Sequence, residues 1–280
     1  MNTLQRLSAF GAALAGIFAI GIGTGAAFGP AASAKETMAP APMGEGVVSA
    51  RDGYRFVPAK RQLAKDGGTF HFVIEGPKGA PVLDFQQEHD KDLHFILVNR
   101  DLTIFHHVHP TRAADGTWSI DLPALPAGSY RAVADFHVAH GPRLALGTDL
   151  SVAGDYTPTA LAEPANTSTT DGYEITMHSD VRKGGEVKIA LTVRKDGKVV
   201  TDLQPYLGAS GHMVAMRSGD LAYAHVHPDD YVDGTVHFDA ELNSQGRYGL
   251  FFDFKYGNTV HTATFTFDQG LVTGAPSMND

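Results

Sequence analysis

An internal repeat constrains the fold of this chain more than any other feature of the sequence. At an offset of 118 residues, His94 aligns with His212, and the motif His107-Val108-His109-Pro110 aligns with His225-Val226-His227-Pro228. The further matches are Asp115-Gly116-Thr117 with Asp233-Gly234-Thr235, Gly128 with Gly246, Tyr130 with Tyr248, Asp135 with Asp253, and Phe136 with Phe254. Self-similarity at a fixed offset indicates a duplicated unit, and this unit is about 100 residues long, the size of one sandwich domain.

Both halves of the repeat have the sequence pattern of short β-strands. The expected strands are rich in β-branched and aromatic residues and lie between Gly or charged positions. They include residues 70–74, 93–98, 130–136, 187–193 and 248–254. Tyr130 and Tyr248 each follow a glycine at the start of a late strand, where a tyrosine corner is found in immunoglobulin-like domains. The sequence predicts an all-β fold of two tandem immunoglobulin-like β-sandwich domains.

The N-terminus predicts export from the cytoplasm. Arg6 is the only charged residue before an apolar run over residues 7–28, and Ala32-Ser33-Ala34 has the small residues of a cleavage site. The run is longer than the usual core of a signal peptide and long enough to cross a bilayer, so a cleaved signal and a retained anchor both stay open. The folded part is expected to be secreted or to lie at the outer face of the cytoplasmic membrane, tethered through residues 7–28 if the signal is uncleaved.

Shifts in composition divide the rest of the chain. Stretches rich in Pro, Ala, Gly and Thr predict a tether and an interdomain linker. The predicted parts are a signal peptide or transmembrane anchor at 1–34, a tether at 35–47, a first sandwich at 48–153, a linker at 154–170, a second sandwich at 171–268 and a tail at 269–280.

Composition and motifs exclude several classes of function. The formal charge of −9 without a basic stripe disfavours nucleic-acid binding, which requires neutralised phosphates. The absence of cysteine excludes disulfides and thiolate metal sites. The sequence contains neither the nucleophile-elbow motif nor a phosphate-binding glycine loop before a helix. We therefore expect a protein that is not an enzyme.

The matched histidines are the candidate ligands of a metal ion. Residues i and i+2 of a strand point to the same side, so His107 with His109, and His225 with His227, each form a pair of imidazoles suited to copper or zinc. His94 and His212 are the leading additional ligands, followed by Asp135 and Asp253. A carboxylate could instead orient a ligating histidine. Each repeat is expected to hold its own site, independent of the other.

A structural role for the same residues is the alternative. Histidines at the end of a strand can hydrogen-bond the backbone, and Asp135 and Asp253 can fix a turn. The chain would then be a non-catalytic sandwich protein at the cell surface or tethered to the membrane, and its partner would be another extracytoplasmic protein instead of a metal ion.

The segments around the repeated motif carry a family resemblance. Residues 101–110 and 220–228, with Asp-Leu followed by H-x-H-P, resemble a motif of poorly characterised exported actinobacterial proteins with tandem β-domains. The resemblance covers most of residues 48–268. Because members often accompany metal-transport proteins, it implies handling of copper or zinc. Many members also have a His-rich tether, and this chain departs from that pattern because residues 35–47 contain no histidine.

Overall fold

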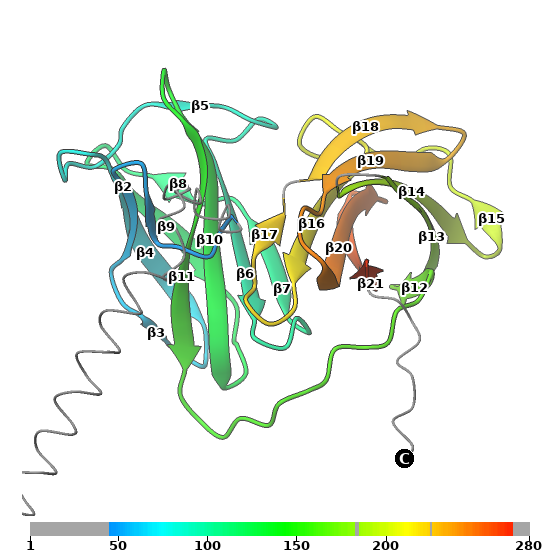
Figure 1. Ribbon diagram of the computed structural model, residues 1–280, viewed down its shortest axis with the longest axis horizontal. Coiled ribbons are helices and arrows are strands. Elements are labelled where there is room, and N and C mark those ends of the chain that lie inside the picture. The colour runs from blue at the N-terminus through cyan, green and yellow to red at the C-terminus, as the bar shows by residue number, and fades with distance from the viewer. Residues whose placement is uncertain (1–44, 183–184, 225, 271–280) are drawn as a thin grey trace, which may run out of the picture. The chain divides into compact units, whose positions relative to one another are not determined.

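The computed structural model describes residues 45–182, 185–224 and 226–270 (Figure 1). The predicted signal or anchor at 1–34, residues 35–44 of the tether and residues 271–280 of the tail lie outside the described residues. The regular secondary structure of the described residues consists of β-strands alone, as predicted. The search for a membrane-spanning helix, which covered only these residues, found none.

The first repeat is a sandwich of two sheets. One sheet has the order β1-β2-β4-β9-β8, and the other has the order β3-β11-β10-β6-β7 with β5 paired to β10. Neighbouring strands are antiparallel except for the parallel pair of β3 and β11. The strands of this repeat are β1 Ala50–Arg51, β2 Tyr54–Pro58, β3 Gln62–Leu63, β4 Gly68–Glu75, β5 Phe85–Gln86, β6 Leu93–Asn99, β7 Phe105–Val108, β8 Thr111–Arg112, β9 Thr117–Leu122, β10 Gly128–Val138 and β11 Arg143–Val152.

The second repeat has the same arrangement of main strands. One sheet has the order β12-β13-β14-β19-β18 with β15 on β14, and the other has the order β17-β16-β20-β21. The strands are β12 Thr167–Thr170, β13 Tyr173–Val181, β14 Glu186–Lys195, β15 Lys198–Val199, β16 His212–Arg217, β17 Tyr223–Ala224, β18 Val226–Val232, β19 Thr235–Glu241, β20 Gly246–Tyr256 and β21 Thr259–Gln269. The prediction of two tandem immunoglobulin-like sandwiches is confirmed.

Each sandwich encloses its own apolar core. The first core includes Phe72, Phe95 and Trp118, and the second includes Phe238 and Phe252, all of them buried. Both predicted tyrosine corners are present. The hydroxyl of Tyr130 donates to the carbonyl of Pro126 at 2.7 Å, and that of Tyr248 donates to the carbonyl of Ser244 at 2.8 Å. These bonds close the turn before the strand in which each tyrosine lies.

A third apolar core joins the two repeats. Side chains alternate between the two faces of a strand, so β6 directs Leu93, Phe95 and Leu97 into its own sandwich and directs Ile96 and Val98 outward. The outward residues pack with Val214, Met216 and Phe251 of the second repeat. Phe105 stacks on Phe251 with ring centroids 4.2 Å apart. Burial of both faces explains why β6 is apolar along its length.

The chain segments on either side of the first sandwich also contact it. The amide of Tyr223 donates to the carbonyl of Glu45 at 2.8 Å, and the amide of Gly46 donates to the carbonyl of Ala145 at 2.9 Å. Residues 45–47, which we assigned to the tether, therefore bond to both repeats. In the assigned linker, the hydroxyl of Tyr156 donates to Asp101 at 2.6 Å. The last four linker residues, 167–170, form β12.

Candidate metal centre

The alternation of side chains also places the matched polar residues. His94 lies two residues before Ile96 on β6 and therefore shares its outward face, toward the second repeat. On the same principle, Asp135 follows Val133 on β10, His212 precedes Val214 on β16, and Asp253 follows Phe251 on β20. These side chains consequently gather around the contact between the repeats.

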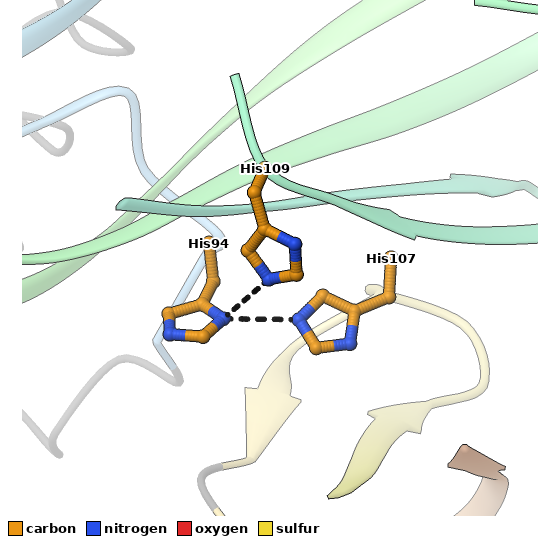
Figure 2. A group of neighbouring side chains, drawn as sticks. All are labelled: His94, His107 and His109. Carbon is orange, nitrogen blue, oxygen red and sulfur yellow. Dashed lines mark hydrogen bonds between the residues drawn. The ribbon is translucent and has the colours of Figure 1, made fainter. Parts of the chain in front are cut away.

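Three histidines of the first repeat converge on one point. Nδ1 of His94 lies 3.1 Å from Nε2 of His107 and 3.1 Å from Nε2 of His109 (Figure 2). One ligand atom from each residue lies within 4.8 Å of the other two, and among the described residues this is the group that could hold a metal ion. His107 comes from β7 and His109 from the segment just after it, while His94 comes from the neighbouring strand β6. We call this group the His94 triad.

The remaining nitrogens of two triad rings have protein acceptors. Nε2 of His94 lies 3.1 Å from the carbonyl oxygen of Glu88, and Nδ1 of His107 lies 3.0 Å from a carboxylate oxygen of Asp253. A carbonyl oxygen only accepts hydrogen bonds, and an ionised carboxylate does the same. Each of these nitrogens therefore carries a proton, which leaves Nδ1 of the neutral His94 ring with its lone pair directed at His107 and His109.

Burial keeps His94 and His109 in the neutral form that binds metals. Desolvation, reinforced by His107, lowers the pKa of His94 to about 4. Desolvation, followed by the neighbouring His107 and His94, lowers the pKa of His109 to about 2. Imidazoles bind metals when unprotonated, so both rings are ready ligands at neutral pH.

The residues of the second repeat are placed differently from our expectation. The ring of His212 lies 6.2 Å from that of His107, whereas the centroids within the triad are 4.9–5.3 Å apart, so His212 stands beside the triad. Asp253 bonds to His107 on the side facing away from the triad nitrogens. The first repeat's triad depends on the other repeat, because the carboxylate that bonds His107 belongs to Asp253, and a separate site in the second repeat stays a prediction. His225 and the side chain of His227 lie outside the described residues.

Asp135, a predicted ligand, stands opposite His94 in the pairing of β6 with β10. Its carboxylate accepts a hydrogen bond from the hydroxyl of Tyr223 at 2.8 Å and is paired with Arg143 at 3.5 Å. The same Arg143 pairs with Glu88 at 2.8 Å. Asp135 thus meets groups of both repeats, as Asp253 does.

Several residues near the triad, among them the following three, were not identified from the sequence. Glu88 contributes a backbone carbonyl, and such a role leaves no mark in the side-chain pattern. Tyr223 aligns with Phe105 at the repeat offset, so the difference between phenol and phenyl ring was the available signal. His89 has no histidine counterpart in the second repeat, and for that reason it was not among the matched candidates.

A model of one protein family matches the second repeat. Residues 168–270 match the model of a family described as a domain of unknown function, DUF8832. No curated protein matches the chain.

Solved structures of other tandem-domain proteins match the chain with low identity and low TM-scores. The N-terminal Ig1-2 module of Drosophila receptor protein tyrosine phosphatase DLAR has 9% identity over 77% of this chain and 97% of its own, with a TM-score of 0.21. Domains 5-6 of the S-layer protein SbsC have 12% identity over 77% and 97%, with a TM-score of 0.22. The FN1-FN3 domains of chicken CNTN1 have 10% identity over 76% and 64%, with a TM-score of 0.23. These likenesses are too distant to bear on function.

Proposed function

We propose that this protein is an exported, non-catalytic metal-binding protein that holds zinc or copper in the His94 triad. The carrying observation is the convergence of three ring nitrogens on one point, with the outer nitrogens of His94 and His107 bonded to protein acceptors. Histidine ligands of metals commonly donate their second N–H to a carbonyl or a carboxylate in this way.

The spacing of the nitrogens suits a tetrahedral ion. Ligand atoms at about 2.0–2.1 Å from a tetrahedral zinc are about 3.3–3.4 Å from one another. Both contacts of His94 Nδ1 are 3.1 Å, so small movements of the rings would complete the coordination. Three imidazoles with a remaining open position also suit copper.

Electrostatics supports a cation in preference to a proton at this point. Nδ1 of the neutral His94 ring lies 3.1 Å from two neighbouring nitrogens, Nε2 of His107 and Nε2 of His109. It has a single lone pair, so it can accept a full hydrogen bond from only one of them at a time. A metal ion accepts a lone pair from all three rings at once.

The alternative is a sandwich protein at the cell surface or in the extracytoplasmic space whose partner is another protein. The observation that favours it is the hydrogen-bonded state of the histidines: His94 contacts His107, His109 and Glu88 without any ion. In that case the triad would stabilise the contact between the repeats and would bind no metal.

Titration of the purified full-length chain separates the two functions. After chelator treatment, Zn(II) and Cu(II) are added at neutral pH against a competing chromophoric chelator. The matched variants are His107→Ala with His109→Ala, and, as control, His71→Ala, which removes a histidine that bonds to Ser119 on the exposed face of β4.

The proposal predicts tight binding by the native chain and by the His71→Ala variant, and loss of that binding in the double variant. Equal binding by all three proteins, or binding by none, would contradict it. A double variant that is less stable yet binds the same amount of metal would support the structural role of the histidines.

A further inference from the structure

We propose that a second metal position lies beside the triad, between His89 of the first repeat and His212 of the second. This inference deepens the proposed function, because it treats the contact between the repeats as a two-metal centre. It rests on the orientation of His212, on the backbone at His89 and on the spacing of the two rings.

His212 is held as His94 is held. Its Nε2 donates to the carbonyl oxygen of Tyr206 at 2.8 Å, and Tyr206 stands at the repeat offset from Glu88, whose carbonyl accepts from His94. With the proton fixed on Nε2, the neutral ring keeps its lone pair on Nδ1. The second repeat therefore presents the same nitrogen as the first, from a side chain that is 6% exposed.

His89 lies in the left-handed region of backbone conformation. It has φ 49° and Asp90 has φ 64°, in a tight turn closed by two backbone bonds between Glu88 and Lys91. Two successive residues with positive φ are typical of a type I′ turn, where Asn and Gly are preferred. The turn fixes the backbone from which the His89 ring reaches its contact with His212.

The two rings are spaced as the rings of the triad are. The centroids of His89 and His212 are 4.9 Å apart with an interplanar angle of 81°. His94 and His109 in the triad are also 4.9 Å apart, at 83°. The pair can therefore share an ion as two triad members can, with water or a carboxylate completing the coordination.

A small cavity lined by histidines and by apolar side chains provides the space for this ion. It has a volume of about 30 Å³, and its lining includes His89, His94, His107, His212 and Asp135. A water molecule needs at least about 10–15 Å³, so the cavity holds one water or one ion. The positive charge of Arg143, which also lines it, is offset by the carboxylates of Glu88 and Asp135.

The test combines metal counting with a probe of distance between ions. The purified full-length chain, stripped of metal, is titrated with Cu(II), and the electron paramagnetic resonance spectrum is recorded at each step. We expect two equivalents per chain and, at saturation, the half-field transition of two coupled copper ions. His89→Gly should remove the second equivalent and the coupling while the first equivalent remains, because glycine accepts the positive φ of this turn.

His140→Gly is the matched control, since it removes an exposed histidine that also has positive φ, 58°. It should leave both equivalents in place. His212→Gln tests the partner ring and should act as His89→Gly does. One equivalent in the native chain, unchanged in His89→Gly, would overturn the second position and leave the proposed function standing. A native chain that binds neither copper nor zinc would overturn both, and two uncoupled equivalents of copper would overturn only the shared centre.

Discussion

The two H-x-H segments have the same sequence pattern but different strand pairing. In the first repeat, His107 belongs to β7, which pairs with β6, and the chain crosses to the opposite sheet only at β8. In the second repeat, the strand paired with β16 ends at Ala224, and the backbone of His227 already pairs with Asp239 of β19 in the opposite sheet. The chain therefore changes sheets before His227 in the second repeat and after His109 in the first.

The orienting carboxylates differ in the same way. Asp253 bonds to His107 of the triad and accepts from Thr262 at 2.6 Å. Its counterpart Asp135 accepts from the hydroxyl of Tyr223, at a position where the first repeat has Phe105. Repetition of the ligand residues is therefore not enough to repeat the site. The pairing of the strands and the hydroxyl of Tyr223 also decide which group each carboxylate contacts.

The largest expected effect comes from the centre of the triad. Nδ1 of His94 is the atom that contacts both other rings, so His94→Ala should weaken zinc binding at the triad by at least about 100-fold, since it removes a ligand. Competition titration measures the change. Binding that survives in the His94→Ala variant but disappears in His212→Ala would place the principal site in the second repeat and reverse the comparison.

The next effect tests the contribution of one repeat to the site of the other. Asp253→Asn keeps the shape of the side chain and removes its charge, and loss of a group that orients a metal-bound histidine costs about 10–100-fold in affinity. Asp135→Asn is the matched control in the other repeat, and its effect on affinity should be smaller. Equal losses in the two variants would show that both carboxylates serve one centre.

The strand pattern and the repeat were enough to predict the two sandwiches, the tyrosine corners at Tyr130 and Tyr248, and the meeting of His94 with His107 and His109. The contact between the repeats could not be predicted. Ile96 and Val98 lie in the predicted strand 93–98, whose apolar residues are compatible with a central strand of one sandwich, and nothing in a single repeat indicates that their face packs on another domain. The bond from His107 to Asp253 joins residues 146 positions apart, and it follows from that packing alone.

The repeats should respond alike to acid. Burial lowers the pKa of His94 and of His212 to about 4 in the folded chain, below the unperturbed value of about 6.5. Between these values the unfolded chain binds more protons, so stability is lost as the pH falls from about 6.5 to about 4. We expect the melting temperature of the metal-free chain to fall over this window, and His94→Gln and His212→Gln to reduce the fall equally. A melting temperature independent of pH in this range would contradict the buried neutral state of both rings.

The smallest effect tests the hydroxyl that distinguishes Asp135 from Asp253. Tyr223→Phe reproduces the residue of the first repeat and removes one donor from a buried carboxylate, which should cost about 1–3 kcal/mol in the free energy of unfolding. Tyr156→Phe removes an exposed tyrosine–aspartate bond, to Asp101, and should cost less, because water replaces the lost partner. Chemical denaturation of the metal-free chain measures both changes.

The zinc affinity of the Tyr223→Phe variant is a more informative measurement than its stability. Because the hydroxyl of Tyr223 donates to Asp135, which is not a member of the His94 triad, Tyr223→Phe should leave zinc binding at His94, His107 and His109 unchanged while it lowers stability. If it weakens zinc binding as much as Asp253→Asn does, the carboxylate of Asp135 supports the triad through the shared cavity. The two repeats would then contribute equally to the site, and the difference between phenol and phenyl ring would have no bearing on metal binding.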